Sequence, residues 1–103
     1  MPTKGLSLSQ LLAAKVRPCL VLSVEPESRD RVLVTLVPHT TSTRETRFEI
    51  SVPKPFLKSG AFDVQGLVTV APQRLIRKLG FLQTSEIALV EAAVKRWLGL
   101  ASS

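Results

Sequence analysis

Residues 16–24 of the chain read VRPCLVLSV, an apolar run rich in β-branched side chains. A run of this kind predicts a strand that is buried on both faces of a sheet. Pro18 has no amide hydrogen to donate, so we expect the start of this strand to lie at an edge or a bulge. Cys19, within the run, is interpreted as a small buried hydrophobic residue rather than a reactive thiol.

The residues after this run predict a hairpin. Residues 25–30 contain Pro26 and four charged side chains, which is typical of a turn, and residues 31–37 alternate with Val32, Val34 and Leu36 on one side. Counting back from the turn places residue 17 opposite about residue 38, with a slip of one or two residues allowed. We therefore expect Arg17 to lie near the polar loop predicted at 39–45.

Further strands are predicted at 46–52, with Phe48, Ile50 and Val52 facing inward, and at 67–70, whereas 75–82 is ambiguous. The clearest helix lies near the C-terminus. Thr84 or Ser85 is its expected N-cap, and Gly99 follows its end. Apolar residues recur at spacings of three and four along it, and Trp97 on that face is expected to be a core or dimer contact.

Short strands followed by one helix predict a mainly β fold, a small curled antiparallel sheet or barrel with a packed helix. With 103 residues we expect a single domain spanning 1–103. No stretch reaches the ~18 apolar residues of a membrane span, and residues 1–10 lack a signal-peptide pattern. We therefore expect a cytoplasmic protein with no membrane contact.

Composition narrows the possible functions. One cysteine and one histidine exclude an internal disulfide, a zinc ribbon and a His-rich metal centre, so no metal is expected. There is no Gly-rich phosphate loop and no Ser-His-Asp or Cys-His pattern. A formal net charge of +6 favours a polyanionic partner, while four Phe and one Trp are few for a protein that grips bases by stacking.

A guanidinium beside hydroxyls and an imidazole is an arrangement suited to a phosphate group, because arginine donates two parallel hydrogen bonds and keeps its charge. Arg17 and the run His39-Thr40-Thr41 are expected to form such a cluster. Simpler interpretations stay open. Arg17 can pair with Glu45 or Glu49, the threonines can make local turn bonds, and His39 can be an ordinary loop histidine.

Four motifs, in this order, resemble those of the MazF/PemK family of toxins. KVRPCLVLS at 15–23 is similar to the family's Arg-Pro-x-Leu-Val-Leu-Ser signature. PHTTS at 38–42 followed by RFEI at 47–50 is similar to its Pro-x-Thr turn and Phe-Glu-Val strand. Gly-Leu-Val at 66–68 and Leu-Gly at 79–80 complete the order, so the resemblance covers about 15–100.

The resemblance implies the toxin of a type II toxin–antitoxin pair. Its expected fold is a homodimeric SH3-like barrel (CcdB/MazF-like) with a C-terminal α-helix. Its expected activity is endoribonuclease cleavage of single-stranded mRNA through the RNA's own 2′-hydroxyl, with no cofactor, and its expected partner is a cognate antitoxin. The alternatives are a catalytically inactive relative that binds an antitoxin or gyrase, and an RNA-binding barrel with no toxin role.

By motif, Arg17 and Thr40 are the catalytic residues that the resemblance implies, and His39 is a candidate proton carrier. Lys15, Thr41 and Arg44 are expected to contact RNA.

The chain also departs from the family pattern. Residues 1–14 form a divergent N-terminal segment that is expected to be a short strand or a helical turn. Thr69, Ala71 and Pro72 occupy the positions where some members carry a second catalytic set, so that second mode of catalysis is excluded.

Overall fold

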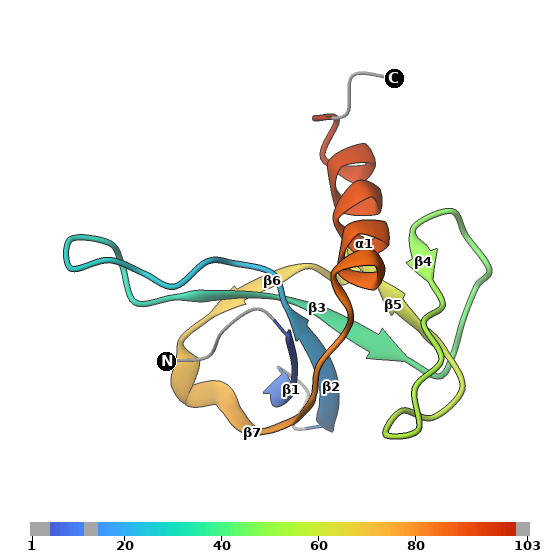
Figure 1. The fold of residues 1–103 in the computed structure, drawn as a ribbon, viewed down its shortest axis with the longest axis horizontal. Coiled ribbons are helices and arrows are strands. Elements are labelled where there is room, and N and C mark those ends of the chain that lie inside the picture. The colour runs from blue at the N-terminus through green and yellow to red at the C-terminus, as the bar shows by residue number, and fades with distance from the viewer. Residues whose placement is uncertain (1–4, 12–14, 101–103) are drawn as a thin grey trace.

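The computed structural model describes residues 5–11 and 15–100 of the chain (Figure 1). Its elements, in order, are β1 (Gly5–Leu11), β2 (Lys15–Val21), β3 (Val34–Thr40), β4 (Glu49–Ile50), β5 (Ala61–Asp63), η1 (Val64–Gly66), β6 (Val68–Val70), η2 (Pro72–Arg74), β7 (Leu75–Gly80) and α1 (Thr84–Trp97).

The strands form one seven-stranded antiparallel sheet with a single helix against it. The order is β4-β5-β3-β2-β1-β7, and β6 pairs with β3 beside this path. The sheet curls around its own inner face, while α1 stands against the other face near β4 and β5 (Figure 1). The predicted mainly β, barrel-like architecture with a C-terminal helix is therefore confirmed.

The core has two parts, one on each face of β2 and β3. Leu20 and Val37 belong to the cluster beneath α1, together with Phe62 and Val90. Alternate residues of the same strands point the other way, where Cys19 and its neighbours form a second cluster inside the curl. Because side chains alternate along a strand, one apolar run supplies both clusters. The prediction of a strand buried on both faces, with Cys19 as a buried hydrophobic residue, is confirmed.

The hairpin register differs by two residues from the expected one. Cys19 pairs with Pro38 and Val21 with Leu36, so the same register carried on places Arg17 opposite Thr40. The connection between the two strands is longer than the turn expected at 25–30. Residues 22–33 lie outside both strands, and Val32 is exposed. β3 in turn runs on through residues 39 and 40, which were expected in a loop, because these two residues pair with β5.

The N-terminal segment supplies a strand. β1 pairs with β2 along its whole length and with β7 on its other side, so β2 is an interior strand. Pro18 is paired with Leu8 of β1, and the ladder between β2 and β3 stops at Cys19. Pro18 is therefore paired on the β1 side, and the expected edge is present only on the side that faces β3. Residues 1–4 and 12–14 of the predicted divergent segment lie outside the described residues.

Two further boundaries differ from the prediction. The strand expected at 46–52 is reduced to β4, although Phe48 and Val52 are buried as expected. The helix N-cap is Gln83 rather than Thr84 or Ser85, because Glu86 reaches back to accept a hydrogen bond from the Gln83 amide at 2.7 Å. Within the described ranges 5–11 and 15–100, no helix is both long enough and apolar enough to cross a membrane.

Candidate functional site

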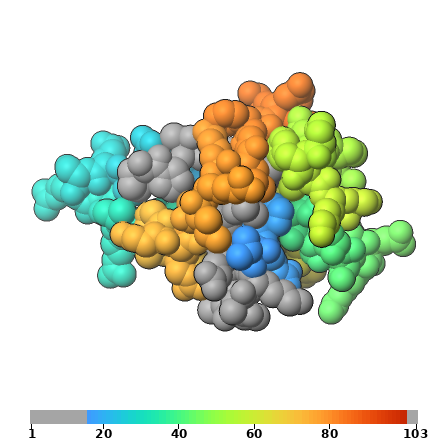
Figure 2. All heavy atoms as spheres, turned by 90° about the horizontal axis from the view of Figure 1, so that it is seen from below, coloured from blue at the N-terminus to red at the C-terminus, as the bar shows by residue number. Residues whose placement is uncertain are grey.

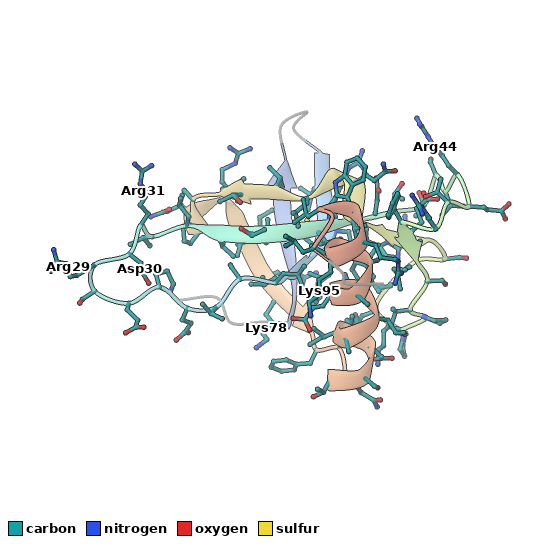
Figure 3. The ribbon with its side chains drawn as sticks, turned by 90° about the horizontal axis from the view of Figure 1, so that it is seen from above. Arg29, Asp30, Arg31, Arg44, Lys78 and Lys95 are labelled. Carbon is teal, nitrogen blue, oxygen red and sulfur yellow. The ribbon has the colours of Figure 1, made fainter. Side chains whose placement is uncertain are left out.

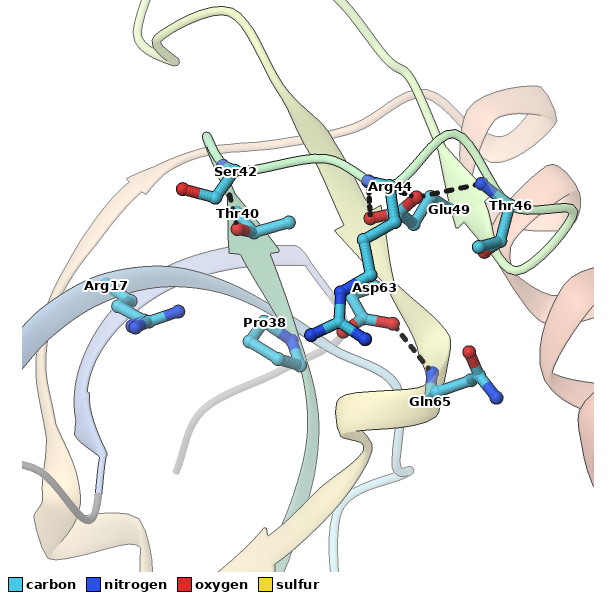
Figure 4. Close-up of a pocket in the computed structure, with 9 residues that line it drawn as sticks. All are labelled: Arg17, Pro38, Thr40, Ser42, Arg44, Thr46, Glu49, Asp63 and Gln65. Carbon is cyan, nitrogen blue, oxygen red and sulfur yellow. Dashed lines mark hydrogen bonds between the residues drawn. The ribbon is translucent and has the colours of Figure 1, made fainter.

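Arg17 and Thr40 come together where β2 begins and β3 ends. In the register carried on from Cys19 and Pro38 they stand opposite each other and on the same face of the sheet. Both line a hollow of about 310 Å³ (Figure 4). We call it the carboxylate hollow; its lining is Arg17, Pro38, Thr40, Ser42, Arg44, Thr46, Glu49, Asp63 and Gln65. The expected proximity of Arg17 to Thr40 is therefore present.

Thr40 is held by hydrogen bonds and close packing. It pairs with Ala61 of β5, and its hydroxyl oxygen accepts a hydrogen bond from the Ser42 amide at 3.0 Å. The hydroxyl proton is thereby left to donate to another group. Gly60 lies directly beneath, since a Cβ at that position would overlap the Thr40 carbonyl oxygen. The Gly60 contact therefore holds the Thr40 backbone, and the Ser42 amide holds its hydroxyl oxygen.

The loop from residue 41 to residue 48 is organised by the Glu49 carboxylate. Its Oε1 accepts hydrogen bonds from the amides of Arg44 and Thr46, both at 2.9 Å, and its Oε2 accepts a second hydrogen bond from the Arg44 amide at 3.0 Å. These bonds from Thr46 and Arg44 lower the pKa of Glu49. Glu45 takes a left-handed conformation with φ of 54°, which turns the chain back toward Glu49.

The Arg17 guanidinium is open to a ligand. Glu49 is committed to the loop amides, and within residues 5–11 and 15–100 no carboxylate forms an ion pair with Arg17. The side chain is half-buried and projects toward Pro38 in Figure 4. The interpretation of Arg17 as half of a structural ion pair with Glu45 or Glu49 is therefore wrong for the described residues.

His39 lies on the other face of β3. It is only 5% exposed and meets the Phe62 ring edge-on, with centroids 5.0 Å apart. Desolvation by this burial lowers the pKa of His39. The ring is therefore neutral at pH 7 and sits in the core rather than in a loop. A neutral ring keeps the capacity to accept a proton. Alternation along β3 points it to the face opposite the Thr40 side chain, yet at the strand end it lines a hollow together with Arg17 and Thr40.

A second hollow, of about 610 Å³, adjoins the first and shares Arg17, Thr40 and Ser42 with it. We call it the basic hollow; its lining is Val16, Arg17, Pro18, His39, Thr40, Thr41, Ser42, Phe56, Lys58, Arg77 and Leu79. Figure 2 shows this side of the molecule, where β2 in blue lies between β7 in orange and the green segment that follows β3. None of its described lining residues carries a carboxylate.

The other predicted RNA contacts fall around these hollows. Thr41 lines the basic hollow and Arg44 the carboxylate hollow. Lys15 begins β2, and its side chain lies outside the described part of the chain. Lys58, Asp63 and Arg77 were missed by sequence reasoning, since each reaches these hollows beside residues that are far away in the chain. Within the described residues, no group of three His, Cys, Asp or Glu side chains is placed to hold a metal.

Comparison with known proteins identifies relatives at the level of family and fold. No curated protein matches the chain. A Mycobacterium tuberculosis toxin, MazF-mt6, is 25% identical with a TM-score of 0.80, covering 95% of this chain and 99% of its own. A mycobacterial endoribonuclease solved with its cognate antitoxin is 20% identical with a TM-score of 0.84 and full coverage of both chains. MazE–MazF of Deinococcus radiodurans is 20% identical with a TM-score of 0.79, covering 98% of this chain and 97% of its own.

A family model matches residues 10–98, which is most of the chain and includes both strands that carry Arg17 and Thr40. Its description is the PemK-like, MazF-like toxin of type II toxin–antitoxin systems. The match agrees with the order of the four motifs and with the curled sheet that brings them together. The chain therefore belongs to the PemK-like, MazF-like family of toxins of type II toxin–antitoxin systems.

Proposed function

We propose that this protein is an endoribonuclease that cleaves single-stranded RNA through the RNA's own 2′-hydroxyl and without a metal. The observation that carries the proposal is the uncommitted Arg17 guanidinium beside a Thr40 hydroxyl whose proton is free to donate. Two solved relatives support it, since one is described as an endoribonuclease and the other as a MazF toxin.

The proposed reaction needs no nucleophile from the protein. The 2′-oxygen forms a bond to the adjacent phosphorus while the bond from phosphorus to the 5′-oxygen breaks. The products are a 2′,3′-cyclic phosphate and a free 5′-hydroxyl, and the proton lost by the 2′-hydroxyl is balanced by the one gained at the 5′-oxygen. The protein's task is to hold the phosphate and to stabilise the charge that develops on its oxygens.

Arg17 and Thr40 suit that task in different ways. The Arg17 guanidinium donates paired hydrogen bonds to two phosphate oxygens in the planar geometry that suits them. The Thr40 hydroxyl donates one further hydrogen bond, because its own oxygen is already engaged by the Ser42 amide. His39 stays a predicted proton carrier, and Lys15, Thr41 and Arg44 stay predicted RNA contacts.

We propose two protein partners, a second copy of the chain and an antitoxin. We infer that the protein forms a homodimer and that a cognate antitoxin with an acidic segment inhibits it, as the net charge of +6 favours. A mycobacterial relative was solved together with its antitoxin, which supports this inference.

The test is cleavage of a long RNA in EDTA, scored for fragments with 5′-hydroxyl ends. We expect Arg17→Ala to lower the cleavage rate by ~10²–10³-fold, because one preorganised donor to the developing charge is removed. The matched control is Arg29→Ala, which removes an exposed guanidinium from the tip of the 22–33 connection, at the opposite end of the molecule from Arg44 (Figure 3). A wild-type protein that yields no fragments contradicts the proposed activity, and an Arg17→Ala variant with the normal rate contradicts the assigned site.

A further inference from the structure

The two hollows on either side of the Arg17–Thr40 pair differ in charge. The basic hollow has three cationic side chains, Arg17, Lys58 and Arg77, and no carboxylate among its described lining. The carboxylate hollow has two guanidinium groups, Arg17 and Arg44, and two carboxylates, Glu49 and Asp63. One hollow is therefore strongly positive and the other is balanced.

An RNA strand that passes this pair presents different groups to the two hollows. Its phosphates are attracted to the positive hollow and repelled by carboxylates at close range. The balanced hollow therefore suits a neutral group, and the neutral part of a nucleotide is its base. A base entering there has its polar edge among hydrogen-bonding side chains, which is how single-stranded RNA is read.

Of the two carboxylates, only Asp63 has an oxygen that accepts no hydrogen bond from the described residues. Both oxygens of Glu49 already accept hydrogen bonds from the amides of the 41–48 loop. Asp63 caps η1 with Oδ1, which accepts a hydrogen bond from the Gln65 amide at 3.1 Å. Its Oδ2 accepts no hydrogen bond within the described residues, and Figure 4 shows the carboxylate in the hollow with Gln65 beyond it.

We propose that Asp63 determines specificity: through Oδ2 it selects, next to the scissile phosphate, a base that carries an exocyclic amino group. A carboxylate oxygen is an acceptor only, so it pairs with an amino group such as N4 of cytosine and not with the O4 carbonyl of uracil. The η1 cap holds the carboxylate in place before the base arrives, so little ordering is needed on binding. This inference rests on the proposed ribonuclease activity.

The experiment compares cytidine with uridine at each position around the cleavage site, in oligonucleotides that are otherwise identical, for the wild type and Asp63→Asn. At one position we expect the wild type to prefer cytidine by about 5- to 100-fold in kcat/KM. In Asp63→Asn, Oδ1 still accepts the Gln65 amide while an NH₂ group replaces Oδ2 and donates. We therefore expect the preference at that position to invert toward uridine while the fold is kept.

Asp30→Asn is the matched control, because Asp30 makes the same kind of local contact in the 22–33 connection, accepting the Glu27 amide at 2.9 Å (Figure 3). It is expected to leave the preference unchanged. If the wild type cleaves RNA and Asp63→Asn keeps the same preference at every position, the inference is wrong and the proposed activity stands. If the wild type cleaves none of the oligonucleotides, the proposed activity fails and this inference fails with it.

Discussion

At the scale of single residues, the position of Thr40 depends on the absence of a side chain at Gly60. Gly60 precedes β5, and the Thr40 carbonyl and the His39 ring occupy the place where its side chain would stand. A Cβ there would lie 3.0 Å from Cε1 of His39 and would overlap the Thr40 carbonyl oxygen. The end of β3 can approach β5 this closely only with glycine at residue 60.

We predict that Gly60→Ala destabilises the protein and displaces the Thr40 hydroxyl. Overpacking of this kind costs about 1–3 kcal/mol in free energy of unfolding, because backbone rather than a flexible side chain has to move. Chemical denaturation measures the stability, and the cleavage assay measures the effect on the site. Ser59→Ala, an exposed neighbour, is the control. Wild-type stability in Gly60→Ala would show that β3 and β5 are not packed in this way.

At the scale of elements, α1 is joined to the rest of the fold at its first turn. Glu86 Oε1 accepts hydrogen bonds from the Lys54 ammonium and from the Gln83 amide, both at 2.7 Å. Lys54 belongs to the segment between β4 and β5, so this contact ties the start of the helix to the far edge of the sheet. At the other end, Trp97 meets Phe48 edge-on with centroids 5.3 Å apart.

The first-turn contact predicts an acid-sensitive contribution to stability. The hydrogen bond from Lys54, and then that from Gln83, lower the pKa of Glu86 below its ordinary value of 4.5. A depressed folded-state pKa stabilises the protein above the unfolded value, and this stabilisation disappears as the pH falls through the folded value. We expect Glu86→Gln to lower the unfolding temperature at about pH 7 and to match the wild type at about pH 2.5.

Thermal unfolding followed by circular dichroism at a series of pH values measures this difference. Glu25→Gln, an exposed carboxylate in the 22–33 connection, is the control and is expected to follow the wild type throughout. If the difference in unfolding temperature between Glu86→Gln and the wild type stays constant with pH, the ionised carboxylate is not its source.

At the scale of the whole molecule, positive charge is concentrated where three distant segments meet. Arg17 comes from β2, Lys58 from the segment before β5, and Arg77 from β7. If these side chains bind phosphates, their contribution to affinity is sensitive to salt, because each phosphate that they neutralise releases counterions from the RNA.

We predict that Lys58→Gln and Arg77→Gln each reduce the salt dependence of RNA binding. For a single strand, the slope of log K against log salt is expected to become shallower by ~0.7 for each phosphate that the variant no longer neutralises. An oligonucleotide with a 2′-deoxy sugar at the cleavage site prevents turnover during the titration. Arg29→Gln, at the tip of the 22–33 connection, is the control for a change in net charge alone (Figure 3). Unchanged slopes in both variants would exclude the basic hollow as the phosphate path.

Much of the fold and part of the site follow from local sequence pattern. The double-faced burial of β2, the helix near the C-terminus and the approach of Arg17 to Thr40 were predicted from apolar runs, periodicity and turn residues. These properties depend on neighbours in the chain, because side-chain alternation and helix periodicity are set residue by residue. The family's motifs are likewise visible as local strings.

The remaining features were decided by contacts between distant segments. Only the pairing of β3 with β5 extends β3 through Thr40 and buries His39 against Phe62. The same pairing carries Asp63 into the hollow beside Arg17. No periodicity within one segment encodes such a meeting, since it depends on which strand edges remain free when the sheet curls. Tertiary structure therefore determined that Asp63, with an oxygen left to bind a ligand, lies beside Arg17 and Thr40, whereas the bonds that commit Glu49 run to amides three and five residues away.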